Sequence, residues 1–137
     1  MSLKNYHVFI SHSWKYSTPY ETVKRWLDEA NYFIWSDYSV PFYDSLDANT
    51  DRKLKTEIRQ QIASCSCVVI LSGMYVSYSK WINYEIDTAI EMGKPIIGVK
   101  PWGQERIPAK VSENASVIVG WNSASVVQAV RDYSLCN

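Results

Sequence analysis

The sequence has 137 residues, a formal net charge of zero and 47% hydrophobic residues. A chain of this length fits one domain with a sizeable buried core, and we expect a single domain over residues 1–137. The balanced charge, without a basic run, argues against nucleic-acid binding through a charged surface. No apolar run reaches transmembrane length and no signal peptide precedes the first strand-like residues, so no membrane association is expected.

The cysteine pattern argues against a disulfide-bonded or zinc-binding protein. Cys65 and Cys67 are two positions apart and Cys136 stands alone, which provides neither a disulfide framework nor zinc-ligand spacing. We therefore expect no metal site, a reducing cytoplasmic location, and a buried Cys67 that packs as a small hydrophobe. The ten tyrosines and six tryptophans imply partly exposed rings, and such rings often stack on a ligand or a partner.

The first half of the chain predicts alternating strands and helices. Residues 32–35 form a continuous apolar run, which is typical of a strand buried on both faces. Residues 36–49 have no helical period, and a loop of this length in a small domain is often functional. The expected elements are a strand over residues 6–10, a helix from residue 18 or 19 to 30, the strand over 32–35 and a helix over about 50–64.

The second half continues this alternation. Trp81 opens a helix that ends at Gly93, a C-cap residue, because Pro95 prevents its continuation. The apolar face of this helix consists of Ile82, Ile86, Ala89 and Ile90. The other expected elements are strands over residues 68–71, 95–99 and 117–119, a helix from residue 122 or 123 to about 133, a loop over 74–79 and an irregular segment over 101–113.

The order of these elements predicts a parallel sheet that is covered by helices on both faces. Ligands of such folds bind at the carboxyl ends of the strands, near the point where the strand order reverses. Those ends are residues 11–14, 36–38 and 72–73. The helix opened by Trp81 follows the third strand, so Glu85, one turn into this helix, is expected at the same edge.

The carboxyl ends lack the residues of several common α/β activities. A phosphorylated receiver domain needs a carboxylate after the third strand, where this chain has Ser72. A dinucleotide fold needs a glycine-rich turn after the first strand, where this chain has Ser11-His12-Ser13, and no phosphate-binding GxxxxGK[ST] loop is present. The same serines match a flavin-binding turn only weakly. His12 is a candidate general base, but a hydrogen bond that orders the loop is the main alternative, because no nucleophile is clearly placed beside it.

Glu85 is the remaining candidate for chemistry. A carboxylate in an aromatic crevice can stabilise an oxocarbenium-like centre or contact ribose hydroxyls, which is the chemistry of cleaving an N-glycosidic bond at a ribose. Trp14, Tyr38 and Trp81 are candidates to stack on a base or a nicotinamide ring. The alternatives are that Glu85 is an ordinary solvated helix glutamate and that Trp81 only packs its helix against the core.

Four stretches together resemble a TIR domain, in particular the divergent prokaryotic TIR-like proteins of Thoeris antiphage defence. Residues 6–13, YHVFISHS, are similar to the opening strand of that family. Asp37 follows the second strand as an acidic residue does in the family, and residues 62–72 are similar to the segment that leads into its third strand. Residues 79–85 resemble the signature S-x-W-x-x-x-E, which places the essential glutamate at Glu85.

The resemblance implies a flavodoxin-like three-layer sandwich with a five-stranded parallel sheet. It also implies an enzyme that cleaves NAD, as substrate and not as cofactor, and forms a cyclic ADP-ribose-type signal for a separate effector protein. Two stretches depart from the family pattern. Val40-Pro41-Phe42 replaces a common Pro-Gly in the loop, and Trp14-Lys15 stands where some NAD-cleaving relatives carry arginines, so Lys15 would meet a phosphate as a point charge.

We therefore predict Glu85 as the catalytic residue, which stabilises the ribosyl cation or positions the ribose. The predicted substrate contacts are Ser11, His12, Ser13, Trp14, Lys15, Asp37, Tyr38 and Trp81. Two other hypotheses remain open: a non-catalytic signalling module that self-associates through TIR–TIR contacts, and a nucleoside-cleaving enzyme such as a deoxyribosyl transferase.

Overall fold

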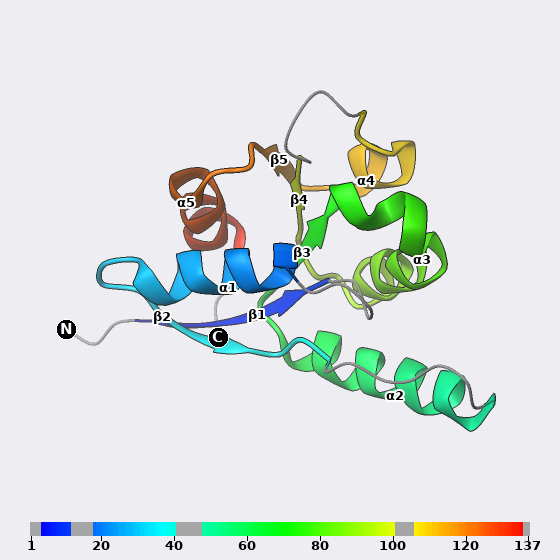
Figure 1. Cartoon of the computed structure of the whole chain (residues 1–137). Coiled ribbons are helices and arrows are strands. Elements are labelled where there is room, and N and C mark those ends of the chain that lie inside the picture. The colour runs from blue at the N-terminus through cyan, green and yellow to red at the C-terminus, as the bar shows by residue number, and fades with distance from the viewer. Residues whose placement is uncertain (1–3, 12–17, 41–47, 101–105, 136–137) are drawn as a thin grey trace.

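The computed structural model describes residues 4–11, 18–40, 48–100 and 106–135, without the side chains of residues 48–51 and 74–79. Five strands form one parallel sheet in the order β2-β1-β3-β4-β5 (Figure 1). This order is the flavodoxin-like one, and it confirms the predicted fold class. The elements are β1 (Asn5–Ile10), α1 (Thr18–Glu29), β2 (Ile34–Asp37), α2 (Ala48–Ser64), β3 (Cys67–Leu71), the 3₁₀ helix η1 (Ser72–Met74), α3 (Tyr75–Glu91), β4 (Ile96–Val99), α4 (Ala109–Asn114), β5 (Val117–Val119) and α5 (Ser123–Tyr133).

Each face of the sheet has its own hydrophobic core. Successive strand residues point to opposite faces, so in β3 Val68 and Ile70 join one core, whereas Cys67 and Val69 join the other. Figure 1 shows α2, α3 and α4 on the first face and α1 and α5 on the second. All five residues of β3 are buried, as expected for a central strand that is covered on both sides. The expected burial of Cys67 is confirmed.

The second strand differs from its prediction. It comprises Ile34–Asp37 instead of residues 32–35, and it is an edge strand whose first residue, Ile34, is 46% exposed. Tyr32 belongs to the turn after α1, where it adopts φ +53° and is 83% exposed. An apolar run specifies a strand but not its place in the sheet, so the expected burial on both faces was wrong.

Two helices extend into stretches that were predicted to be irregular. The expected loop over residues 74–79 is wrong, because η1 leads directly into α3, which begins at Tyr75 and not at Trp81. The stretch Tyr75–Lys80 contains serine and β-branched or aromatic residues, which are weak helix formers in isolation, so tertiary contacts outweigh local propensity there. In the segment expected to be irregular over residues 101–113, Pro108 provides the N-cap of α4.

The predicted helix ends are confirmed where a specific residue produces them. Gly93 adopts φ +68° after α3, a left-handed conformation that glycine accepts without steric cost. The Asn122 side chain caps α5 by accepting a hydrogen bond from Ser125 N at 2.8 Å. On the apolar face of α3, Ile82, Ile86 and Ala89 are buried as expected. Ile90 is 49% exposed and lies outside that face.

Gly98, in β4, allows α4 to approach the sheet closely. A Cβ atom at this position would lie 3.0 Å from Val111 Cγ1 and 3.4 Å from Ile118 Cγ1. We predict that Gly98→Ala lowers the free energy of unfolding by roughly 1–3 kcal/mol, the usual cost of overpacking a core. Urea unfolding followed by tryptophan fluorescence measures this change.

A second substitution tests the cause of this loss. Val111→Ala removes the methyl group that the new side chain would meet, so Gly98→Ala should cost less in a Val111→Ala background than in the wild type. Equal costs in the two backgrounds would contradict the proposed contact with α4.

Candidate active site

Serine side chains continue the hydrogen-bond pattern of the sheet past the carboxyl ends of β1, β2 and β3. Ser11 Oγ accepts a hydrogen bond from Leu71 N at 3.0 Å, and Ser11 N donates to Val69 O at 2.8 Å. Ser39 Oγ accepts from Ile10 N at 2.9 Å. We call this edge the carboxyl rim, defined by residues 11, 37–40 and 72–73. Its strand ends are fixed to one another by side chains as well as by backbone.

Asp37 fixes the end of β2 to helix α1. One carboxylate oxygen accepts a hydrogen bond from the Tyr20 hydroxyl, and the other accepts from Ser39 N at 2.8 Å. Burial, together with the neighbouring Asp37 carboxylate, raises the pKa of Tyr20 well above its usual range, so Tyr20 stays a neutral donor at physiological pH. Both oxygens of Asp37 therefore already accept internal hydrogen bonds that order the rim.

Glu85 is a buried carboxylate on the face of α3 that packs against the sheet. Its exposed fraction is 2%, and Trp81, one turn earlier, is 9% exposed. Burial raises the pKa of Glu85 well above its ordinary value of 4.5, and no cation or donor among the described residues offsets this effect. The solvated-glutamate alternative is therefore wrong, because a solvated carboxylate would be exposed.

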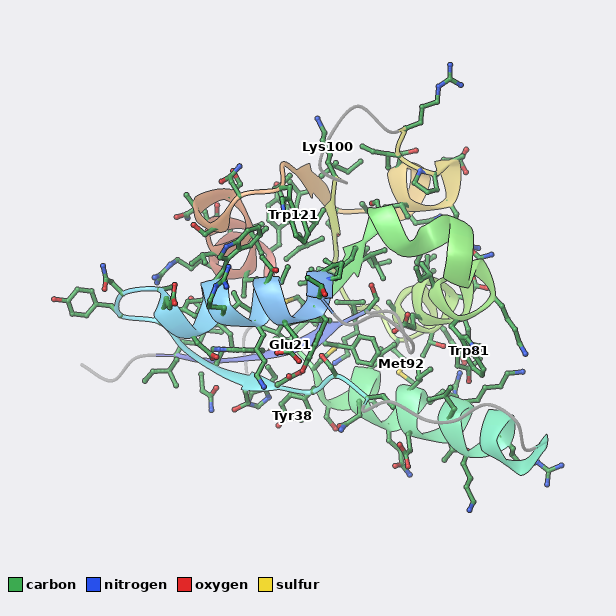
Figure 2. The ribbon with its side chains drawn as sticks, in the orientation of Figure 1. Glu21, Tyr38, Trp81, Met92, Lys100 and Trp121 are labelled. Carbon is green, nitrogen blue, oxygen red and sulfur yellow. The ribbon has the colours of Figure 1, made fainter. Side chains whose placement is uncertain are left out.

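Aromatic rings surround the start of the buried part of α3. The Trp81 and Tyr84 rings meet edge to face at 6.4 Å between centroids, and Lys80 Nζ lies 4.9 Å from the Trp81 centroid. Figure 2 shows Trp81 between α3 and α2, and Tyr38 beside the end of β2. Tyr38 and Trp81 both pack into the core on the α2–α3 face. Trp81 is therefore a packing residue of that core, as the alternative that it packs its helix against the core predicted. It also lies one helical turn before Glu85.

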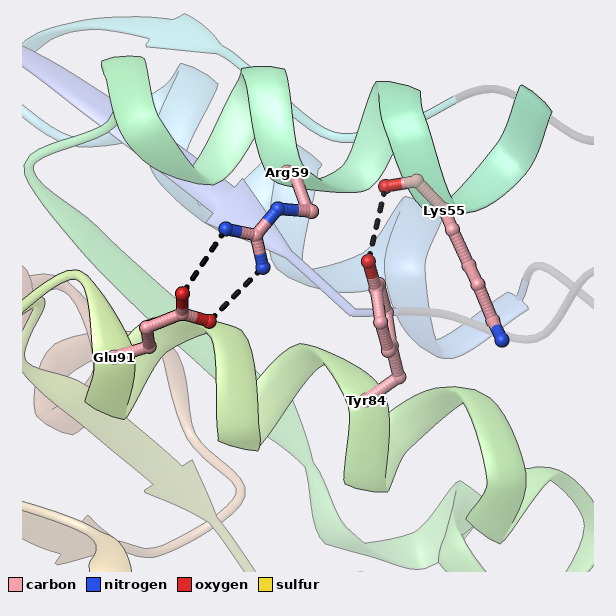
Figure 3. A network of polar contacts seen from close by, with 4 residues as sticks. All are labelled: Lys55, Arg59, Tyr84 and Glu91. Carbon is pink, nitrogen blue, oxygen red and sulfur yellow. Dashed lines mark hydrogen bonds and ion pairs between the residues drawn. The ribbon is translucent and has the colours of Figure 1, made fainter. Parts of the chain in front are cut away.

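Two polar contacts hold α3 against α2 (Figure 3). Arg59 donates to both carboxylate oxygens of Glu91, at 2.9 and 3.2 Å. The Tyr84 hydroxyl donates to the carbonyl oxygen of Lys55 at 3.4 Å. These contacts, one on each side of Glu85 along α3, set the position of the helix that carries the carboxylate.

Five of the nine predicted site residues are among the described residues. Glu85, Trp81, Tyr38, Asp37 and Ser11 belong to the carboxyl rim or to the part of α3 that packs beneath it. Ser11 is fully buried, and its hydroxyl holds β3. The remaining four, His12, Ser13, Trp14 and Lys15, lie outside the described residues, as does the Pro41-Phe42 departure.

Three polar residues of this region were not among the predicted site residues: Tyr20, Ser39 and Ser72, the last of which the sequence had placed at a strand end. Ser39 follows Asp37 by two positions, and this spacing is typical of a side-chain turn, so it could have been found. Tyr20 and Asp37 are brought together only by the packing of α1 on the sheet. Ser72 is buried at the start of η1, and among the described residues its Oγ has no hydrogen-bond partner.

Other reactive groups in the described part of the chain do not form a second centre. Burial raises the pKa of Cys65 to about 12 and that of Cys67 to about 11, so neither thiol ionises readily. No cluster of three His, Cys, Asp or Glu residues that could hold a metal ion occurs among the described residues. None of the described helices is long and apolar enough to cross a membrane.

Two pockets bounded by described residues lie away from Glu85. One, of about 450 Å³, lies between α1 and α5, and the other, of about 520 Å³, lies over β5 and α5. The guanidinium of Arg131, in the first pocket, already donates to the carbonyl oxygens of Asn31 and Tyr32 at 2.8 and 3.4 Å. Neither pocket is lined by a residue of the predicted site.

Comparison with protein families gives one match over most of the chain. The family described as Thoeris protein ThsB, TIR-like domain, matches residues 9–106. This chain belongs to that family. The match includes Ser11, Asp37, Trp81 and Glu85, and it confirms the resemblance that was based on the opening strand and the W-x-x-x-E motif. A comparison with curated protein sequences finds no match.

Solved structures show the same fold at low sequence identity. A CMP N-glycosidase from Clostridium botulinum, BcmB, has a TM-score of 0.58 and 18% identity over 91% of this chain and 98% of that chain. A de novo designed protein with a Rossmann 2x3 fold has a TM-score of 0.53 and 16% identity over 96% of this chain and 94% of its own. These likenesses confirm the α/β fold of the TIR-like domain.

Ser11 should be important for stability, because its hydroxyl satisfies a buried backbone group of β3. We predict that Ser11→Ala leaves the Leu71 N–H without a partner and lowers the free energy of unfolding by roughly 1–3 kcal/mol. Chemical denaturation measures the loss. The matched control is Ser36→Ala, since Ser36 makes a solvent-exposed hydrogen bond to Asn5 Oδ1 and should cost less than about 0.5 kcal/mol. Equal losses for the two variants would argue against a special role for Ser11.

Burial of Glu85 should make the stability of the domain depend on pH. Because its folded pKa lies above its unfolded value, the ionised form destabilises the fold, and this penalty is absent below about pH 4.5 and grows as pH rises toward the folded pKa. We predict that Glu85→Gln is more stable than wild type at pH 8, because glutamine carries no charge that burial would penalise. The two proteins should converge near pH 4. Thermal unfolding across this range tests the sign, and a wild type that gains stability over the variant as pH rises would refute it.

Proposed function

We propose that this TIR-like domain is an enzyme that cleaves the N-glycosidic bond between nicotinamide and ribose in NAD. The observation that carries the proposal is the buried carboxylate of Glu85, which is 2% exposed, lies beside Trp81, and is not compensated by a cation among the described residues. Burying a carboxylate without a partner lowers the free energy of unfolding. Buried ionisable groups with perturbed pKa values concentrate at functional sites. Membership in the ThsB TIR-like family supports the same assignment.

The chemistry follows from the charge of the substrate. The nicotinamide ring of NAD is cationic, so its arrival next to Glu85 would provide the opposite charge that the described residues lack, and would favour the ionised carboxylate. As the C1′–N bond breaks, its electron pair leaves with nicotinamide and the positive charge moves to the ribosyl carbon. A carboxylate in a low-dielectric site stabilises that developing charge more strongly than water does.

The fate of the ribosyl cation decides the product. Capture by water, with loss of a proton, gives ADP-ribose, whereas capture by a nitrogen of the adenine ring gives a cyclic ADP-ribose. We propose the cyclic product as a signal in antiphage defence that a separate effector protein detects, because the chain belongs to a Thoeris family. The near-complete burial of Glu85 would help to exclude water from the reacting centre.

A second candidate is cleavage of the glycosidic bond in a nucleoside monophosphate. The structural neighbour BcmB, a CMP N-glycosidase, covers nearly the whole chain, and a buried carboxylate serves either substrate by the same electrostatic principle. The two candidates differ in the leaving group, which is a cationic pyridinium in NAD and a neutral pyrimidine in CMP. A pyrimidine leaving group needs a proton from a general acid, whereas nicotinamide does not.

Self-association has a candidate surface at one edge of the sheet. Strand β2 is an edge of the sheet, and near it Tyr32 and Ile34 are 83% and 46% exposed. An open edge with exposed apolar residues is a natural pairing surface for another chain. We propose that assembly through this edge accompanies catalysis, and a sizing column run at several protein concentrations would detect it.

Replacing one buried and one exposed glutamate separates catalysis from folding. We predict that Glu85→Gln lowers nicotinamide release from NAD by about 10²- to 10³-fold, the usual cost of removing one electrostatic stabiliser. Glu113→Gln, on α4 and exposed, should retain most of the activity. Mass-resolved chromatography of NAD incubated at high protein concentration measures both products.

The outcomes of this experiment are distinct. Release that persists in Glu85→Gln would refute the mechanism. Turnover of CMP without turnover of NAD would favour the second candidate. Concentration-dependent assembly without cleavage of either substrate would favour the non-catalytic module.

A further inference from the structure

Ser72 has a buried hydroxyl group that the fold itself does not use. The residue is 3% exposed, and among the described residues its Oγ lacks a hydrogen-bond partner. Leaving a buried hydroxyl unsatisfied costs roughly 1–3 kcal/mol, so native structures seldom contain one without a reason. Ser11, on the neighbouring strand end, shows the contrast, because its hydroxyl is used to bind Leu71 N.

Ser72 is located at the point of the fold where ligands bind in doubly wound sheets. It follows β3 directly, and in the order β2-β1-β3-β4-β5 the ends of β1 and β3 flank the switch point. It also begins η1, which continues into the 17-residue helix α3. The amino-terminal end of a helix carries a partial positive charge and free N–H groups, and both favour a phosphate.

We propose that the Ser72 hydroxyl donates a hydrogen bond to a phosphate oxygen of the nucleotide substrate, at the amino-terminal end of η1 and α3. The assignment rests on the proposed function for its substrate, NAD. Glu85 would act at the nicotinamide end, and Ser72 would hold the pyrophosphate. Ser72 Oγ is buried in this structure, so the contact requires a local rearrangement when the substrate binds.

Ser134 provides a matched control within the same chain. It is the other described residue whose buried hydroxyl has no hydrogen-bond partner, and it neighbours the Cys67 thiol, a weak hydrogen-bonding group. Cys67 begins β3 and Ser72 follows its last residue, so Ser134 lies at the opposite end of the strand, away from the carboxyl rim. Alanine at either position should change the stability little, because the Ser72 hydroxyl is unsatisfied and the Ser134 hydroxyl has only the weakly bonding Cys67 thiol beside it.

The experiment measures NAD binding in the Glu85→Gln protein, in which NAD is not consumed. Titration calorimetry would compare this protein with Glu85→Gln/Ser72→Ala and Glu85→Gln/Ser134→Ala, and inorganic pyrophosphate would serve as a competing probe. We expect Ser72→Ala to weaken NAD binding by about ten-fold or more, as for the loss of a hydrogen bond to a charged group. Ser134→Ala should leave the affinity unchanged, and pyrophosphate should compete with NAD more weakly in the Ser72→Ala protein than in its parent.

Three results would overturn the assignment. Equal NAD affinities in the Ser72→Ala and Ser134→Ala proteins would show that the hydroxyl makes no ligand contact. A weaker affinity for NAD with unchanged competition by pyrophosphate would place the contact on the ribose instead. Absence of NAD binding in the parent protein would exclude NAD as the ligand. The proposed function would fail separately, through nicotinamide release that persists in Glu85→Gln.

Discussion

The burial of one carboxylate is the constraint on which the rest of this structure depends. Glu85 lies on the inner face of α3, and burial raises its pKa without compensation from a described cation. To keep the ionisable carboxyl group of Glu85 buried, α3 must stay packed against the sheet. The Arg59–Glu91 ion pair, the Tyr84–Lys55 hydrogen bond and the packing of Ile82 and Ile86 together fix α3 in that position.

The carboxyl rim combines rigid supports with unused polar groups. The hydroxyls of Ser11 and Ser39 and the carboxylate of Asp37 satisfy backbone or side-chain donors, and so they hold the ends of β1, β2 and β3 at fixed positions. In this region the buried hydroxyl of Ser72 has no hydrogen-bond partner among the described residues, and burial alone raises the pKa of Glu85. A pre-organised frame with a few unsatisfied groups is the arrangement expected of a binding site, because the ligand then gains interactions that the free protein lacks.

The alternation of strands and helices could be predicted from sequence because it depends on local patterns, and the family resemblance supplied the flavodoxin-like fold class. Hydrophobic periodicity and a capping residue define helices such as α5, which Asn122 caps. The W-x-x-x-E motif drew attention to Glu85. The order of the strands depends on long-range pairing, so the edge position of β2 was not visible in its apolar run. The lack of a partner for Ser72 is a property of the packed structure, and no sequence pattern expresses it.

The burial of Glu85 has a practical consequence for ligand discovery. A fold that carries an uncompensated buried carboxylate is less stable than it would be with a cation at that position. A cationic ligand that pairs with Glu85 would therefore raise the melting temperature by more than its contact area alone implies, whereas a neutral or anionic ligand of the same size would not. A melting-temperature screen of small nucleotide-like compounds would thus rank them by the charge of the group that binds next to Glu85. The ranking would indicate whether the substrate carries a positive charge at that group.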